Sequence, residues 1–414
     1  MHTAGKYLKL KHAHSDKMLS GKTTLTIITK FIILLANFGL AVFTTQIWGS
    51  GGRGEIALVI ANIAIISIFS NVFCGSTIAY HAPVLQRNFL LSLSLTGALI
   101  ISLSGAIIFS LFFGFGYFLP FFLISLLMSV TSSISTYWLG KKNIRTYNLL
   151  TLLNPLLILA SLAVLYFIFK KTALNTVYLA YYIGIGILLL VGLAGLAKKE
   201  AFRAPEFSYS GIRSIIRYGV INEFNSLIQF LNYRLSYYFI ARMLGLAELG
   251  IFSIAVAVSE AVWVISRSMS AIHFSNVINS DDYVKSRHET IVFVKQSFRI
   301  SSLVLCMLVL IPQPVYRFIF GDEFGYVRTL MIYLLPGIIA ISMSNLFEQY
   351  FSGKGNLRVI RNKSLVGLIA TLILLPLLIK KYHLAGACIS VNVSYILSSV
   401  YLWLNFRKEV KPEI

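Results

Sequence analysis

The chain has 414 residues, of which 57% are hydrophobic and only 12% are charged, and its mean hydropathy is +0.78. A soluble protein of this size needs far more polar surface, so the composition indicates a polytopic membrane protein. The formal net charge is +21. Because Lys and Arg lie in short gaps between apolar segments, this basicity reflects membrane orientation, and nucleic acid is not an expected partner.

The apolar segments predict an all-α integral membrane protein with about twelve transmembrane helices, since about 20 residues span the hydrocarbon core. A basic, mobile cytoplasmic tail is expected over 1–22. The first lobe, 23–197, contains predicted spans at 23–47, 55–80, 89–113, 116–138, 146–169 and 174–197. A cytoplasmic linker at 198–213 leads to the second lobe, 214–405, with predicted spans at 214–241, 246–271, 296–318, 328–350, 363–380 and 384–405. A short cytoplasmic tail at 406–414 ends the chain.

Positive charge alternates between the gaps. One side receives both tails and the gaps that contain Lys141, Lys198, Lys285 and Lys363, whereas the other side receives few basic residues, chiefly Arg53, Lys170, Lys171, Arg242, Arg328, Lys380 and Lys381. Because the basic side of a membrane protein stays in the cytoplasm, both termini are expected there.

The sequence also repeats itself. YWLGKKNIR at 137–145 returns as YFSGKGNLR at 350–358, with five identical positions. GSGGRGEIA at 49–57 parallels GLAELGIFS at 245–253, and Lys170–Lys171 parallels Lys380–Lys381. Three matches in the same order predict two copies of a six-helix unit. Because six is even, the copies enter the membrane in the same direction and are expected to face each other across a cavity.

Ionisable residues inside the spans are the candidate functional residues. They are Lys30, Glu223, Arg234, Glu260, Arg267 and Glu348. Each ion at the bilayer centre costs about 2.5–3.5 kcal/mol on insertion scales, so these groups are expected to face water or one another. Glu223 and Arg234 are eleven residues apart and Glu260 and Arg267 seven, spacings that place each pair on one helical face.

An arginine-lined cavity suits an anionic substrate, because guanidinium groups bind phosphate oxygens with paired hydrogen bonds. Substrate contacts are therefore expected from a cationic and amide set, namely Lys30, Arg53, Asn225, Arg234 and Arg267. Glu223 and Glu260 are expected to couple transport to H⁺ or Na⁺. The competing interpretation is that the cations reach lipid headgroups while the glutamates pair with them structurally. Glu348 is expected to be structural. No catalytic residue, metal site or other cofactor is predicted.

Segments 230–245 (FLNYRLSYYFIARMLG), 249–260 (LGIFSIAVAVSE) and 318–326 (FIFGDEFGY) carry a family resemblance, with the GEIAL run at 54–58. The chain resembles the Wzx-type O-antigen flippases of the multidrug/oligosaccharidyl-lipid/polysaccharide (MOP) exporter superfamily. The resemblance implies two six-helix bundles in a V shape, with helices 1, 2, 7 and 8 lining the cavity. The implied substrate is an undecaprenyl-diphosphate-linked oligosaccharide, moved from the cytoplasmic to the periplasmic leaflet of the bacterial inner membrane.

The same resemblance implies a monomer that works beside a polysaccharide polymerase and chain-length proteins. The longer peptidoglycan-precursor branch has helices beyond twelve, so a lipid II role is not expected. A multidrug cation antiporter of the MATE type would share the fold but is expected to have a more acidic and aromatic cavity. A membrane glycosyltransferase or polysaccharide polymerase needs a sizeable exterior loop, and the first such loop is confined to 48–53.

Overall fold

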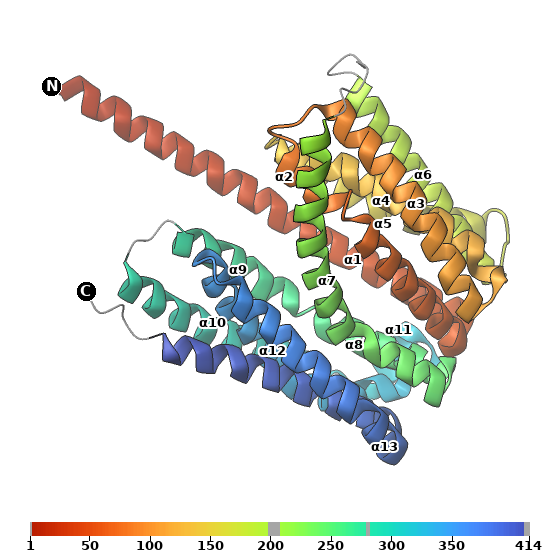
Figure 1. Ribbon diagram of the computed structural model, residues 1–414. Helices are drawn as coiled ribbons and strands as arrows, with labels where there is room; N and C mark the ends of the chain where they lie inside the picture. Colours follow the sequence, from red (N-terminus) through yellow and green to blue (C-terminus); the bar gives the residue numbers. More distant parts are fainter. Residues whose placement is uncertain (1, 198–207, 279–281, 410–414) are drawn as a thin grey trace. The chain divides into compact units, whose positions relative to one another are not determined.

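The computed structural model describes residues 2–197, 208–278 and 282–409, without the side chains of 2–24 and 27. Most of the predicted linker (198–207) and the last residues of the C-terminal tail (410–414) lie outside the described residues. The described chain consists of helices joined by short turns (Figure 1). It divides into two compact units, one formed by Met1–Gly39 with Phe69–Gly219 and the other by Leu40–Ile68 with Val220–Ile414. This division differs from the predicted lobes at residues 40–68 and in the first turns of the seventh predicted span.

The first unit contains the start of α1 (His2–Ser70) and the helices up to the beginning of α7. These are α2 (Gly75–His81), α3 (Arg87–Phe113), the 3-10 turn η1 (Phe115–Tyr117), α4 (Phe118–Gly140), α5 (Ile144–Phe167) and α6 (Asn175–Ala197). The helix α4 lies at its centre and packs against α2, α3, α5 and α6. The helix α1 begins at His2, so the basic segment 2–22 is helical and continuous with the first predicted span.

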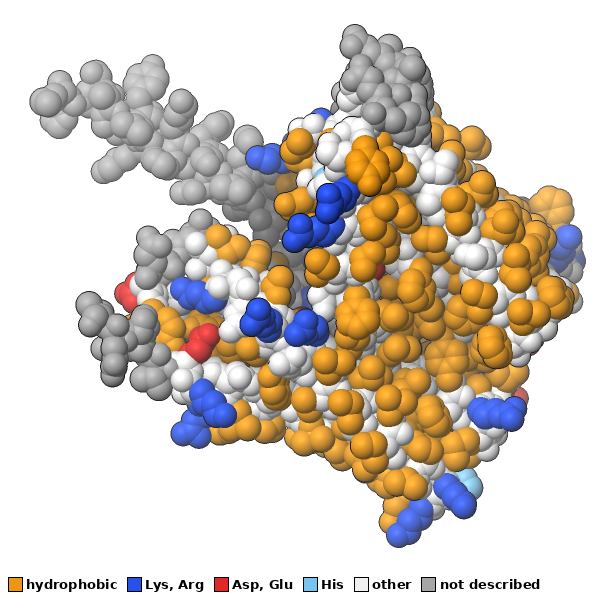
Figure 2. Space-filling view, in the orientation of Figure 1, with side chains coloured by type: hydrophobic (Ala, Val, Ile, Leu, Met, Phe, Trp, Pro, Cys, Tyr) orange, Lys and Arg blue, Asp and Glu red, His pale blue; other side chains and the backbone are white. Residues whose placement is uncertain are grey.

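The helix α3 shows how the sequence produces this packing. Its buried face carries a small residue at every fourth position: Ser94, Ala98, Ser102, Ala106 and Ser110. Small side chains let helices approach closely where lipid and protein are equally apolar. The outward face carries large apolar side chains: Ile100, Leu103, Ile107, Ile108 and Leu111. Hydrophobic side chains cover much of the face drawn in Figure 2, as expected of a surface that meets lipid tails.

The second unit contains the rest of α1 and α7 (Tyr209–Met243) with six further helices and one 3-10 turn. These are α8 (Leu246–Glu260), α9 (Trp263–Ile278), α10 (Tyr283–Leu310), α11 (Gln313–Phe320), η2 (Asp322–Tyr326), α12 (Val327–Gly353) and α13 (Leu357–Lys408). The helix α12 is central and packs against α8, α9, α10 and α13. It can do so because its inward positions are continuously apolar: Leu330, Met331, Leu334, Ile338 and Ile341.

The number of helices is roughly consistent with the twelve predicted spans. Nine helical stretches in the described chain are long and apolar enough to cross a membrane. Two of the long helices are each divided by a residue with positive φ, at Gly49 in α1 and at His383 in α13. The 35-residue α7 is long enough to span but is not one of the nine, because its sequence carries many polar side chains.

Two predicted boundaries were wrong. The ninth span, placed at 296–318, is α10, which begins at Tyr283 and ends at Leu310. It begins earlier because the Asp282 carboxylate accepts a hydrogen bond from the backbone N–H of Lys285 and caps the helix. The eleventh span, placed at 363–380, belongs to α13, which begins at Leu357. Lys285 and Lys363, counted as loop residues, are therefore helical.

The sequence repeat is also a backbone repeat. In the turn between α4 and α5, the N–H of Asn143 donates to the carbonyl of Trp138 at 2.8 Å, and in the turn between α12 and α13 the N–H of Asn356 donates to the carbonyl of Phe351 at 2.8 Å. The φ and ψ angles are −88° and 73° at Asn143 and −86° and 64° at Asn356. The residue before each is left-handed, with φ of 58° at Lys142 and 75° at Gly355.

The left-handed residues also correct one repeat match. Lys170 between α5 and α6 has φ of 52°, and His383 within α13 has φ of 51°. These two residues are 213 positions apart, the same separation as the turns at 137–145 and 350–358. The backbone therefore matches Lys170 to His383, three residues beyond the Lys380 that composition had suggested.

The glycine segments of the repeat contact each other reciprocally within the second unit. A Cβ on Gly54 would lie 1.8 Å from the carbonyl oxygen of Leu246, and a Cβ on Gly250 would lie 1.9 Å from the carbonyl oxygen of Ser50. Such exchange of equivalent contacts is what a local twofold relation produces. Only glycine permits this approach, because any side chain would overlap the facing backbone.

Candidate functional site

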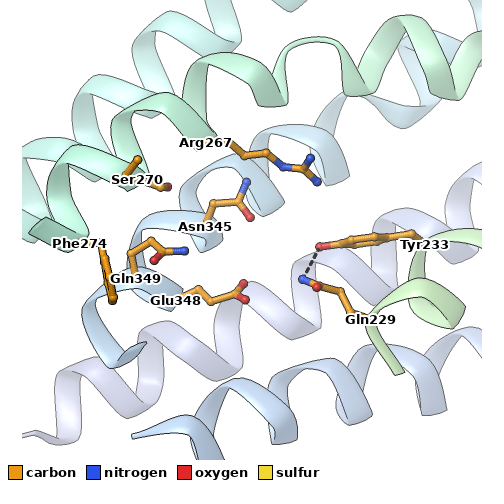
Figure 3. Close-up of a pocket in the computed structure, with 9 residues that line it drawn as sticks. Gln229, Tyr233, Arg267, Ser270, Phe274, Asn345, Glu348 and Gln349 are labelled. Carbon is orange, nitrogen blue, oxygen red and sulfur yellow. Dashed lines mark hydrogen bonds between the residues drawn. The ribbon is translucent and has the colours of Figure 1, made fainter. Parts of the chain in front are cut away.

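A polar pocket of about 450 Å³ lies in the second unit between α7, α9 and α12 (Figure 3). Each helix contributes one stripe at helical spacing, so each lining residue faces the pocket because of its position on its helix. The stripes are Gln229 and Tyr233 from α7; Arg267, Ser270, Ala271 and Phe274 from α9; and Asn345, Glu348 and Gln349 from α12.

Arg267 is the cation that lines this pocket. Its guanidinium lies 5.5 Å from the ring centroid of Trp263, a cation–π contact that orients the side chain. Among the described residues Arg267 forms no salt bridge within 4 Å. In Figure 3, Asn345 lies between Arg267 and Glu348. A positive group beside amides and a hydroxyl is the arrangement that binds a hydrogen-bonding anion.

Glu348 lines the pocket and also contacts a residue that does not line it. Its carboxylate lies 2.6 Å from the Nζ atom of Lys363 on α13, whose side chain is 1% exposed, whereas that of Glu348 is 17% exposed. Glu348 was expected to be structural, and its ion pair fits that expectation, but the carboxylate also borders the pocket. The lysine was missed because its gap was interpreted as a basic cytoplasmic loop.

Arg234 and Glu260 form another ion pair. Both guanidinium nitrogens Nη1 and Nη2 donate to the carboxylate, each at 2.7 Å. The guanidinium also lies 5.1 Å from the ring centroid of Tyr237. The structure therefore brings together one predicted substrate residue and one predicted coupling residue, and their charges cancel. Glu260 ends α8, and neither residue lines the pocket.

The remaining predicted site residues lie elsewhere. Glu223 is buried on α7 and accepts a 2.6 Å hydrogen bond from the side chain of Asn222. Asn225 is half-buried on the same helix, outside the pocket lining. Arg53, in the part of α1 that follows Gly49, donates a hydrogen bond to the Thr44 hydroxyl at 3.3 Å. Lys30 is exposed and belongs to the first unit.

The repeat itself contained a signal for the pocket residues of α12, of which only Glu348 was named from the sequence. Asn345, Glu348 and Gln349 stand 213 positions after Ser132, Ser135 and Thr136 in the first copy. The second copy is therefore larger and more polar at positions where the first has small hydroxyl residues. The described residues contain no group of three or more His, Cys, Asp or Glu that could hold a metal ion. The amide, hydroxyl and charged side chains of the pocket can bind and orient a polar ligand.

No family model matches the sequence, and no curated protein matches it. Solved structures do match the fold. An inward-facing multidrug resistance MATE family transporter of the MOP superfamily superposes with a TM-score of 0.72 at 14% identity, covering 91% of this chain and 94% of that one. The lipid II flippase MurJ superposes with a TM-score of 0.71 at 12% identity, covering 93% and 88%.

A third match is a MOP superfamily transporter from Pyrococcus furiosus, described as having a binding pocket of reversed polarity that suggests a different function. Its TM-score is 0.62 at 15% identity, with 93% of each chain covered. The chain therefore has the fold found in MOP superfamily transporters, as the family resemblance implied.

Proposed function

We propose that this protein is a multi-pass membrane transporter that moves an undecaprenyl-diphosphate-linked oligosaccharide from the cytoplasmic to the periplasmic leaflet of a bacterial inner membrane. The fold supports a transporter, because structures with the same fold are MATE transporters and a lipid II flippase. The identity of the substrate rests on the pocket and on the sequence resemblance to Wzx-type flippases.

The observation that carries the proposal is Arg267 at the polar pocket. A guanidinium binds a phosphate through two parallel hydrogen bonds, a geometry that lysine and amides do not reproduce. The amides of Asn345, Gln349 and Gln229 would serve the hydroxyl groups of the attached sugars. Arg234 is neutralised by Glu260, so its proposed role is to orient α7 against α8 rather than to bind phosphate.

Other parts of the proposal rest on the sequence. Transport is proposed to be driven by H⁺ or Na⁺, with Glu223 and Glu260 as the candidate coupling residues. Both termini are proposed to be cytoplasmic, and a monomer is proposed to deliver its product to a polymerase and chain-length proteins.

The competing candidate is a cation antiporter of the MATE type. Two observations favour it: the fold is the same, and a carboxylate, Glu348, borders the pocket beside the aromatic rings of Tyr233 and Phe274. Binding of a cationic dye by the purified protein, without binding of undecaprenyl diphosphate, would select this candidate over the flippase.

Complementation of a flippase-deficient bacterium, scored by surface polysaccharide, tests the proposal. The wild-type chain should restore polysaccharide, and Arg267→Gln should lower it about tenfold or more, because hydrogen bonds to charged groups contribute about 1.5–3 kcal/mol. Arg267→Lys should restore part of the activity. Arg242→Gln, at an exposed arginine in the last turn of α7, is the matched control and should behave as wild type. Full activity of Arg267→Gln, at equal protein levels, would refute the proposed site.

A further inference from the structure

Lys363 is a buried lysine one side chain away from the pocket. Its Nζ atom contacts the Glu348 carboxylate at 2.6 Å, and only 1% of its side chain is exposed. Glu348 lines the pocket and Lys363 does not. The carboxylate therefore stands between the ammonium group and the space that a ligand would occupy.

The matching turn in the first unit shows that the fold does not require this ion pair. Counting back 213 positions, Glu348 corresponds to Ser135 and Lys363 to Leu150, and both of those side chains are buried. The turn between α4 and α5 has the same backbone geometry as that between α12 and α13 and lacks both charges. Since burying an ion pair is often no more stabilising than apolar packing, the second copy keeps these charges for another reason.

Three titratable or charged side chains face Glu348 from the helices around it. They are Lys363 from α13, Arg267 across the pocket from α9, and Tyr233 from α7. No pocket-lining residue comes from α8 or α10, and Glu260 of α8 is already held by Arg234. With Glu348 ionised, the charges of Arg267, Lys363 and Glu348 sum to one positive charge; with Glu348 protonated they sum to two.

We propose that Lys363 is a second anion-binding group of this pocket and that Glu348 covers it until the carboxylate takes up a proton. The inference rests on the proposed function, because it assigns Lys363 and Glu348 to the diphosphate-binding pocket. In the empty pocket, Lys363 pairs with the Glu348 carboxylate. An arriving diphosphate takes the place of the carboxylate beside Lys363, and Glu348 binds one proton from water. When the ligand leaves, the carboxylate releases that proton and pairs with Lys363 again.

Ligand and proton then assist each other's binding by the same factor, since the two equilibria are linked. The sign follows from charge: protonating Glu348 removes a repulsive negative group and frees a cation, so affinity for an anion rises as pH falls. Neither Arg234 nor Glu260 is needed for this linkage. Glu348 is thereby assigned a proton-linked role in ligand binding, separate from the coupling role proposed from the sequence for Glu223 and Glu260.

The test is the dissociation constant of undecaprenyl diphosphate for the full-length protein in lipid nanodiscs, measured from about pH 5.5 to about pH 8. Glu348→Gln mimics the protonated carboxylate. It should bind about tenfold more tightly than wild type at high pH, within the 5- to 150-fold range of linked sites, and the advantage should vanish at low pH. Taking the ratio of variant to wild type at each pH cancels the ionisation of the diphosphate itself.

Two variants separate the parts of the proposal. Lys363→Met should weaken binding at low pH, where wild type has the lysine free. The ratio of the double variant Glu348→Gln/Lys363→Met to Glu348→Gln should not change with pH, because both lack the carboxylate. Glu289→Gln, a carboxylate on α10 outside the pocket, should match wild type throughout. If the ratio of the Glu348→Gln dissociation constant to that of wild type did not change with pH, or if Lys363→Met bound as wild type does, the inference would be overturned.

Inorganic pyrophosphate, measured in the same way, distinguishes this inference from the proposed function. If the lipid does not bind but pyrophosphate follows the predicted pH pattern, the roles proposed for Lys363 and Glu348 are supported and the flippase proposal fails. If the lipid binds without the pattern, the flippase proposal is supported and the roles proposed for Lys363 and Glu348 fail. If neither probe binds, both are overturned.

Discussion

Charged side chains in the spans differ in whether an ion pair offsets the free-energy cost of leaving water. Arg234 and Lys363 each pair with a carboxylate within 2.7 Å, whereas Arg267 forms no salt bridge within the described chain. The sequence marked Arg234, Glu260 and Arg267 as unusual because of their position, and this needed only the hydropathy pattern. It did not say which would pair, because pairing depends on the distance between helices that are remote in sequence.

The Arg234–Glu260 pair should behave as a coupled unit. Arg234→Leu and Glu260→Leu should each destabilise the protein, because each leaves one charge uncompensated. The double variant should lose less than the sum, with a coupling energy of about 0.5–3 kcal/mol. Denaturation of the four proteins in the same detergent measures this. Additive effects would mean that the two side chains are solvated separately.

For the helices, the spacing of residues along the chain predicted which side chains share a face better than residue type predicted where a helix begins. The stripe of small residues on α3 and the polar stripes on α7, α9 and α12 follow from a period of 3.6 residues. The boundary of α10 was missed because charged residues such as Lys285 and Arg287 were interpreted as a loop. In the structure they lie on the helix, where Arg287 donates to the backbone carbonyls of Phe406 and Glu409 on α13 and just beyond it.

The glycine contact gives a sharp prediction at this scale. Gly54→Ala and Gly250→Ala should each destabilise the protein by about 1–3 kcal/mol, the usual cost of overpacking, because the new Cβ would overlap a carbonyl oxygen. Gly51→Ala is the matched control, since nothing lies within 4 Å of a Cβ at that position. Thermal unfolding in detergent compares them. Equal melting temperatures for all three variants would contradict the close contact.

For the whole molecule, hydropathy and repetition predicted an all-helical membrane protein with about twelve spans, and the family resemblance added the MOP transporter fold. This worked because lipid demands about 20 apolar residues per crossing and satisfied backbone hydrogen bonds. The orientation in the membrane remains a prediction from the distribution of Lys and Arg.

Cysteine labelling tests that orientation. Lys141 and Lys171 are exposed beyond opposite ends of α5, and this helix of 24 residues is about 36 Å long at 1.5 Å per residue. In a background without Cys74, Cys306 and Cys388, a membrane-impermeant maleimide added to spheroplasts should label Lys171→Cys but label Lys141→Cys only after lysis. The reverse pattern would place the termini outside the cytoplasm.

The amino-acid sequence by itself determined the helical class, an approximate number of spans, the repeated turns and the set of charges that the membrane makes costly. These depend on the local period of apolar residues and on the energy of leaving water, which are properties of short segments. Only the tertiary structure decided that Arg234 meets Glu260, that Glu348 pairs with Lys363, and that Arg267 borders a polar pocket with three amide side chains. Such partnerships depend on how helices pack, because a few degrees of rotation about a helix axis change which side chains meet.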